Sequence, residues 1–287
     1  MTRTIWHIPL LAVALALAVT SCASPAAPDA APSRTAASPT PSPPPPPSAD
    51  PVVREVPLSQ WERMTATGMW RKGCPATREG LRRVEINHHD FDGQIQRGVL
   101  VVASDTADSV VRIFTGLFEA EFPIRSMKPV EEFGGDNKAS LAADNTAAYN
   151  CRRPNQINAP VTASPHANGR AVDINPVENP WIDLRCKCWF PRPEHKERTP
   201  AAGKILENDA VWQLFADEGW VWQNIKVPDY MHFDTGYPSK PYVRGQNPSP
   251  APSIQYQEPS DLPPDPKPSS KPSPPVSAGT STPAPPS

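Results

Sequence analysis

Apolar residues in the first half of the central region recur with the periods of a strand and then of a helix. The run Gly98–Ala103 is short, continuous and apolar, which is typical of a buried strand. The next segment, Asp105–Phe122, carries apolar residues three and four positions apart, which predicts an amphipathic helix. Ser104 or Thr106 can cap its start, and Pro123 ends it. The apolar positions are Val110, Val111, Phe114, Leu117, Phe118 and Phe122.

The second half of this region predicts shorter elements on either side of a long loop. Gly169–Asn175 alternates like a strand, and Asn208–Glu218 has the apolar spacing of a helix. Trp220–Trp222 and Met231–Asp234 are predicted to form two more strands. The loop Pro176–Gly203 is rich in proline and charge. This mixture predicts a single α+β domain with helices packed on a mostly antiparallel sheet.

The N-terminus has the pattern of an export signal. Arg3 supplies positive charge, and the apolar run Ile8–Val19 is too short for an ordinary membrane span. Val19–Cys22 resembles a bacterial lipobox, in which Cys22 would be lipidated and would anchor the chain to the membrane. Ordinary cleavage after Ala23 is the alternative. Either route predicts an extracytoplasmic domain, lipid-anchored or secreted.

Composition divides the 287-residue chain into four parts. Many of its 41 prolines fall in residues 23–57 and 246–287, which predicts a disordered linker and a disordered tail after the signal at 1–22. Residues 58–245 are left for one folded domain. The net charge of -2 and the absence of a long basic run exclude a strongly basic nucleic-acid binder. Nothing in the sequence indicates more than a monomer.

Four cysteines lie in the domain: Cys74, Cys151, Cys186 and Cys188. An even number in an exported domain indicates two disulfides. Cys186 and Cys188 are too close in sequence to pair comfortably, so one is expected to bind Cys74 and the other Cys151. A zinc knot is the alternative, but Cys-x-x-Cys spacing is absent and export favours oxidation.

Two histidines and one aspartate form a candidate metal-binding set. His166 and Asp173 converge if the histidine ends a loop and the aspartate points inward from the following strand. Together with His232 they make a three-ligand zinc set that leaves a fourth position for water. Asp229, three residues before His232, is then placed to act as a base on that water. Taken singly, such residues are more often satisfied polar side chains, and the other histidines, His7, His88, His89 and His195, are expected to lie in the signal or in solvent.

Two motifs give these residues more weight. Ser164–Asp173 follows the pattern Ser-x-His-x-x-Gly-x-Ala-x-Asp, and Asp229–His232 follows the pattern of an acid before x-x-His. In both, the sequence resembles the VanY-type D-alanyl-D-alanine carboxypeptidases, zinc peptidases related to the VanX dipeptidases and to L-alanyl-D-glutamate endolysins. Asn145–Arg152 also resembles that family's segment ending in an arginine. The resemblance spans roughly residues 82–242.

The resemblance implies a role for each matching residue. His166, Asp173 and His232 would be the Zn²⁺ ligands, and Asp229 the general base. Arg152 would stabilise the oxyanion or hold a substrate carboxylate, for which a fixed forked charge is suited. The remaining matching residue, Ser164, would donate a hydrogen bond to substrate or cap its own loop.

The implied function is an exported zinc metallopeptidase that acts on peptidoglycan stem peptides, with removal of the terminal D-alanine as the leading reaction. Cleavage between L-alanine and D-glutamate by a similar site is one alternative. A non-catalytic, cell-wall-binding lipoprotein of the same fold is another. One departure concerns the substrate: Gln223 and Asn224 stand where related sequences often have Gly-Gly. Their side chains would lie near the presumed cleft and affect which peptide fits.

Overall fold

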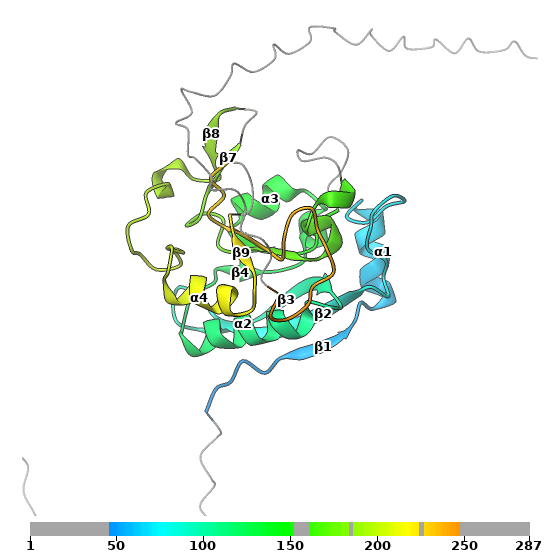
Figure 1. Cartoon of the computed structure of the whole chain (residues 1–287), viewed down its shortest axis with the longest axis horizontal. Helices are drawn as coiled ribbons and strands as arrows, with labels where there is room; N and C mark the ends of the chain where they lie inside the picture. The colour runs from blue at the N-terminus through cyan, green and yellow to red at the C-terminus, as the bar shows by residue number, and fades with distance from the viewer. Residues whose placement is uncertain (1–45, 152–160, 184–185, 224–226, 247–287) are drawn as a thin grey trace, which may run out of the picture. The chain divides into compact units, whose positions relative to one another are not determined.

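The computed structural model describes residues 46–151, 161–183, 186–223 and 227–246. Figure 1 shows these residues in colour. The predicted signal, the lipidation site Cys22, most of the linker and the tail from residue 247 lie outside the described residues, as does Arg152. Within the described residues, the secondary structure is a mixture of helices and small, mostly antiparallel sheets, which confirms the predicted α+β class.

The first sheet is an antiparallel ribbon of three strands. β1 (Val52–Glu55) pairs with β2 (Leu81–His89), and β2 pairs along its whole length with β3 (Ile95–Ala103). The turn between β2 and β3 is fixed by Asp90, whose Oδ1 accepts the backbone N–H groups of Asp92 at 3.0 Å and Gln94 at 2.8 Å. The apolar run Gly98–Ala103 predicted from the sequence is the C-terminal part of β3, which begins at Ile95.

Histidine 88 corrects one expectation from the sequence. We expected it to be solvated because acidic residues follow it, but only 4% of its surface is exposed. Its Nδ1 lies 3.3 Å from the carbonyl oxygen of His89, and burial lowers its pKa. Alternation along β2 turns this side chain inward even though its neighbours in sequence are polar.

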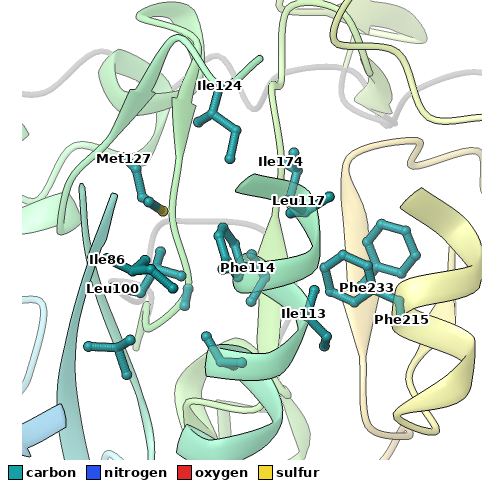
Figure 2. Close-up of a cluster of buried hydrophobic side chains, with 14 of the residues drawn as sticks. Ile86, Leu100, Ile113, Phe114, Leu117, Ile124, Met127, Ile174, Phe215 and Phe233 are labelled. Carbon is teal, nitrogen blue, oxygen red and sulfur yellow. The ribbon is translucent and has the colours of Figure 1, made fainter. Parts of the chain in front are cut away.

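The helix α2 (Ala107–Glu119) forms where the apolar spacing predicts it, and it packs on the first sheet (Figure 1). Thr106 precedes it but donates its hydroxyl to the Ala103 carbonyl at 3.0 Å and does not cap the helix. Figure 2 shows α2 between two groups of apolar side chains. The helix contributes Ile113, Phe114 and Leu117 to the core. One group beside it includes Ile86 and Leu100, and the group on its other side includes Phe215 and Phe233.

The second sheet carries the candidate site. Its order is β6 (Ala171–Asp173), β10 (His232–Asp234) and β9 (Val221–Trp222), all antiparallel. The helix α4 (Ala210–Asp217) covers it through Phe215, whose ring stacks on that of Phe233 with 3.8 Å between centroids. This stack ties the strand that carries His232 to the core around α2.

The remaining elements are short and were not predicted from the sequence. β4 (Ser126–Met127) pairs in parallel with β5 (Asn145–Thr146), and β7 (Trp181–Asp183) pairs antiparallel with β8 (Cys188–Phe190). Two further helices and four 3₁₀ turns complete the described part: α1 (Leu58–Ala66), α3 (Asn137–Ala142), η1 (Val130–Phe133), η2 (Val161–Ala163), η3 (His166–Asn168) and η4 (Pro193–His195). Among the described residues, no helix is long and apolar enough to cross a bilayer.

The disulfide pairing expected from the sequence is wrong. Cys74 pairs with Cys151, and Cys186 pairs with Cys188, with Cα atoms 6.0 Å and 5.2 Å apart, respectively. The short pair forms because Lys187, between its cysteines, adopts a left-handed backbone with φ of 52°. That tight turn at the end of the β7–β8 hairpin brings the two cysteines within the usual Cα separation of a disulfide.

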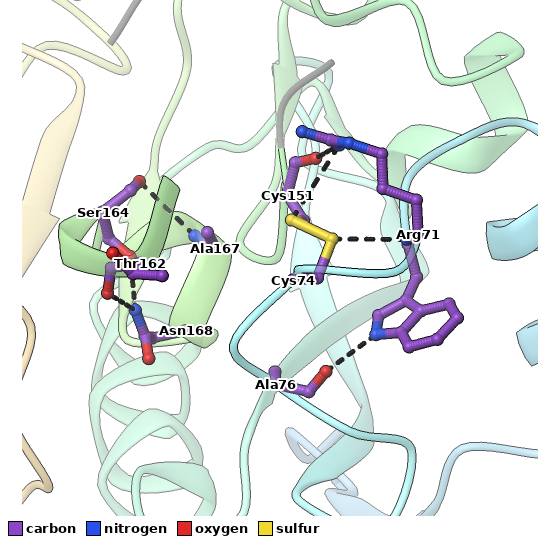
Figure 3. The surroundings of a disulfide bond; sticks show 9 residues. Arg71, Cys74, Ala76, Cys151, Thr162, Ser164, Ala167 and Asn168 are labelled. Carbon is purple, nitrogen blue, oxygen red and sulfur yellow. Dashed lines mark hydrogen bonds between the residues drawn. A yellow bond between two sulfur atoms is a disulfide. The ribbon is translucent and has the colours of Figure 1, made fainter. Parts of the chain in front are cut away.

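The long-range disulfide anchors the segment after α1 to the chain next to the candidate site. Figure 3 shows Arg71 donating its guanidinium to the Cys151 carbonyl beside the bond. Close by in sequence, the indole Nε1 of Trp70 donates to the Ala76 carbonyl at 2.8 Å. Cys151 itself is fully buried. The disulfide therefore joins the α1 region to the segment 147–151, which contacts His166 as described below.

We expect the two disulfides to contribute unequally to stability. In the double variant Cys74→Ala/Cys151→Ala, the free energy of unfolding should fall by about 4 kcal/mol, because the bond closes a loop of 77 residues. The Cys186–Cys188 bond closes a far smaller loop, so the free energy of unfolding should fall by only about 1.5 kcal/mol in Cys186→Ala/Cys188→Ala. Urea denaturation of both variants under oxidising conditions measures the difference. Equal losses would contradict this expectation.

Candidate metal centre

A short turn presents His166 to the second sheet. The 3₁₀ turn η3 (His166–Asn168) is followed by Gly169, which has a φ of 71°. Gly169 accepts the backbone N–H of Ala103 at 2.7 Å, and a Cβ there would lie 2.6 Å from that same nitrogen. A side chain at this position would therefore push the turn away from β3. This explains in physical terms the glycine of the Ser-x-His-x-x-Gly motif.

Three ligand atoms converge from this turn and from two paired strands. Asp173 of β6 and His232 of β10 are direct register partners, so their side chains lie beside each other on one face of the sheet. His166 Nε2 lies 3.0 Å from His232 Nδ1 and 3.2 Å from Asp173 Oδ1, and His232 Nδ1 lies 3.1 Å from Asp173 Oδ1. These three atoms form one compact triangle.

The triangle fits a zinc ion in both size and chemistry. Tetrahedral Zn²⁺ with bonds of about 2.0–2.1 Å places its ligand atoms about 3.3 Å apart, close to the three distances measured here. Two imidazole nitrogens and one carboxylate oxygen are also a donor set that zinc prefers. The histidine side chains are almost fully buried, whereas 14% of the Asp173 side chain is exposed. Solvent therefore reaches the set on the side of Asp173.

The outward nitrogens of both histidines are held by acceptors. His166 Nδ1 lies 2.7 Å from the carbonyl oxygen of Ala148, and His232 Nε2 lies 3.0 Å from Asp234 Oδ2. With a metal bound, each ring would donate its remaining hydrogen outward and present the lone pair of its other nitrogen to the metal.

Charge around the site favours a cation. Burial would raise the pKa of the Asp173 carboxyl, but His166 and then His232 outweigh burial and hold that pKa well below its usual range. Burial lowers the pKa of His232, but the carboxylates of Asp173 and Asp234 outweigh it and raise the pKa to about 10. The ring thus holds positive charge tightly between two carboxylates. A metal ion would compete with protons for the same atoms, so its affinity should fall in acid.

Asp229 lies at the entry to β10. Its backbone carbonyl accepts the N–H of His232 at 3.2 Å, and it forms an isolated antiparallel bridge with Trp181 of β7. The β7–β8 hairpin therefore supports the segment that carries Asp229. This arrangement fixes the backbone of the predicted base directly beside one predicted ligand.

Gln223 lies next to this segment and has an unusual backbone. Its φ is 53°, in the left-handed region that favours glycine, which is the residue that related sequences often have here. Its N–H donates to the His232 carbonyl at 2.9 Å, and its Oε1 accepts the Asp229 N–H at 3.4 Å. The side chain thus contacts the backbone of Asp229. Its neighbour Asn224 lies outside the described residues.

The other two predicted site residues differ in what can be said of them. Arg152 lies outside the described residues. Ser164 is 6% exposed, and its Oγ accepts the N–H of Ala167 at 3.4 Å within the His166 turn (Figure 3). Its carbonyl accepts the Asn168 side chain at 2.8 Å. This geometry corresponds to the loop-capping alternative for Ser164.

Two groups that contact the histidines were not predicted from the sequence: the Ala148 carbonyl and the Asp234 carboxylate. The Ala148 carbonyl is a backbone group, which no residue type signals. Asp234 follows His232 by two residues in a predicted strand, and alternation would have placed both on one face. That spacing was a readable signal.

A buried pair of carboxyls flanks the site. Asp144, the residue before β5, accepts hydrogen bonds from the Arg125 guanidinium at 2.9 Å and from the Val177 N–H at 2.9 Å. Glu178 interacts with the Asp144 carboxyl, and only 8% of its side chain is exposed. Three residues after Asp144, Ala147 exchanges two backbone hydrogen bonds with Asp173. Asp144 and Glu178 therefore help to hold residues 144–147 against residues 173–178, which include the predicted ligand Asp173.

Neutralising Glu178 should stabilise the protein above neutral pH. Burial and the neighbouring Asp144 raise the pKa of Glu178 to about 7. The folded state thus binds a proton that the unfolded state has lost, so stability falls as pH rises from about 4.5 through 7. Glu178→Gln should raise the free energy of unfolding at pH 8 by on the order of 2 kcal/mol and flatten its pH dependence. Denaturation at pH 5 and pH 8 tests this, and a loss of stability at pH 8 would contradict it.

Comparison with known proteins finds a family similarity in the segment that carries the site. Residues 158–235 match the family model of D-alanyl-D-alanine carboxypeptidase, which confirms over these residues the resemblance seen in the sequence. The match contains all three atoms of the triangle and Asp229. Neither a curated protein nor a solved structure matches the chain. The chain is therefore similar to D-alanyl-D-alanine carboxypeptidases over the segment that carries the candidate metal ligands.

Proposed function

We propose that this protein is an exported, zinc-dependent peptidase that removes the terminal D-alanine from peptidoglycan stem peptides. The observation that carries the proposal is the convergence of His166 Nε2, Asp173 Oδ1 and His232 Nδ1 inside the segment that matches the carboxypeptidase family. A donor triangle of this size and a family of this activity support the same chemistry independently.

Different residues of the chain would bind the metal, transfer the proton and contact the substrate. His166, Asp173 and His232 would hold the zinc ion, which when bound polarises a carbonyl and lowers the pKa of water. The Asp229 carboxylate takes a proton from the attacking water and passes it to the amine of the departing D-alanine. The hydrogen bond from the His232 N–H to the Asp229 carbonyl keeps the base in register with the ligand strand. Arg152, which follows Cys151 in sequence, is the proposed partner of the substrate carboxylate or oxyanion.

The proposed location follows from the N-terminal sequence. A signal ending in Cys22 and a proline-rich linker would place the domain outside the cytoplasm and at a distance from the membrane. Two disulfides support the same location, because such bonds persist in oxidising compartments. Peptidoglycan lies in that compartment.

The proposal is tested by mass spectrometry of a stem pentapeptide incubated with the purified protein, once with zinc and once with a chelator. We expect the loss of a single alanine, with zinc only. A chelator-sensitive break after L-alanine would overturn the choice of bond. An untouched peptide in the presence of protein-bound zinc would overturn the carboxypeptidase assignment and favour a wall-binding role.

A further inference from the structure

The imidazole of His232 is held from both sides. Its Nδ1 points into the donor triangle, 3.1 Å from Asp173 Oδ1, and its Nε2 points the opposite way, 3.0 Å from Asp234 Oδ2. Only 5% of the side chain is exposed, so water does not replace either contact. The ring orientation is therefore set by the residue on its far side as much as by the triangle.

Asp234 is built into the sheet in one fixed orientation. It lies two residues after His232 on β10 and is paired with Ala171 of β6 and Val221 of β9. Its side chain is fully buried, and its second oxygen, Oδ1, accepts the N–H of Gly236 at 2.7 Å. A buried carboxylate is unfavourable without charged or hydrogen-bonded partners, so its place against an imidazole is specific.

The two histidines of the triangle have outer partners of different charge. His166 Nδ1 faces a neutral backbone carbonyl, that of Ala148. His232 Nε2 faces a carboxylate. A carboxylate that accepts the hydrogen of a metal-binding imidazole fixes the tautomer and makes the opposite nitrogen a stronger donor. The second effect is weaker for the neutral partner of His166.

We propose that Asp234 is a positioning residue that accepts the Nε2–H of His232 and thereby directs its Nδ1 lone pair to the metal. This inference rests on the proposed function, because it presupposes that the triangle binds zinc. It goes further by naming which nitrogen of His232 binds and which residue outside the triangle sets the affinity.

The test measures the zinc affinity of metal-free protein by competition with a chromophoric chelator. Asp234→Asn keeps the shape of the side chain and removes its charge, and its affinity for zinc should be about 10- to 100-fold lower than that of the wild type. The matched control is Glu218→Gln, which likewise removes the charge of a buried carboxylate, because the side-chain partners of Glu218 include Arg112 and Tyr242 and are not residues of the site. The control should bind zinc as the wild type does.

A second measurement needs no variant and remains decisive if Asp234→Asn does not fold. In the wild type loaded with zinc, ¹⁵N NMR of the histidine rings should show His232 with hydrogen on Nε2 and metal on Nδ1. Metal on Nε2 would overturn the proposal. Because metal on Nδ1 leaves the hydrogen on Nε2 in any case, the role of Asp234 is read from the Nε2–H proton, whose signal should be shifted downfield by a hydrogen bond to a carboxylate; an unshifted signal would also overturn the proposal.

The outcomes separate this inference from the proposed function. A wild type that binds no zinc overturns both. A wild type that binds zinc, with Asp234→Asn binding it equally tightly, overturns the positioning role and leaves the peptidase proposal intact. A loss of affinity in Asp234→Asn but not in Glu218→Gln supports the role of Asp234.

Discussion

Asp229→Asn is expected to bind zinc as the wild type does and to hydrolyse the stem pentapeptide 10²- to 10⁴-fold more slowly. The carboxamide has nearly the shape of the carboxylate but cannot take a proton from water. Its backbone contacts, the hydrogen bond with His232 and the bridge with Trp181, do not depend on the side chain and should persist. Turnover and zinc content are measured on the same preparation, so that the loss is assigned to proton transfer and not to the metal.

The matched control for this variant is Asp217→Asn, which makes the same substitution at an exposed residue on α4 whose side chain accepts a hydrogen bond from Gln213. It should retain wild-type turnover. If Asp229→Asn keeps both its zinc and its turnover, Asp229 is not the base. If it loses the zinc, its role is in metal binding instead.

The pH dependence of turnover adds a check on the same variant. A base that must be ionised makes the rate rise as its carboxyl loses its proton, and this limb of the profile should disappear in Asp229→Asn. A profile of unchanged shape would assign the limb to another group.

The sequence was sufficient to predict the elements that have a strong apolar period. α2 and α4 lie where residues three and four apart are apolar, because one face of each helix is buried against the core. β6 and β10 were predicted within one or two residues. The structure brings His166, Asp173 and His232 together for a related reason: the motif fixes a turn and a strand, and antiparallel pairing places the two strand residues opposite each other.

Short elements and long-range contacts could not be predicted in the same way. β4, β5, β7 and β8 have two or three residues each, too few to show a period. The Cys186–Cys188 bond depends on the left-handed backbone of Lys187, a conformation that its residue type does not signal. Tertiary packing decided these features.

The site residues outside the triangle also differ in whether the sequence could predict them. Asp234 followed from strand alternation and was overlooked, whereas the Ala148 carbonyl depends on where an irregular segment passes the His166 turn. Backbone groups of this kind appear only once the chain is folded. The sequence therefore indicates the metal ligands more readily than the groups that orient them.

His166→Ala is expected to cause the largest loss of all, because it removes one of three donor atoms and opens the buried turn to water. Zinc content should fall from about one ion per chain to a small fraction, and hydrolysis should fall at least 10³-fold. The matching treatment of the wild type is removal of zinc with a chelator, which should abolish hydrolysis until zinc is restored. Zinc should not rescue the variant at the concentration that restores the wild type.

The control for this variant is His195→Ala, the same substitution in the η4 turn of the charged loop. It should keep both zinc and turnover, which shows that the loss is specific to the triangle. Circular dichroism of the metal-free proteins separates lost metal from lost fold, since His166 also contacts the Ala148 and Asn150 backbone. A folded His166→Ala protein that holds one zinc ion per chain and turns over at the wild-type rate would contradict both the ligand assignment and the peptidase mechanism built on it.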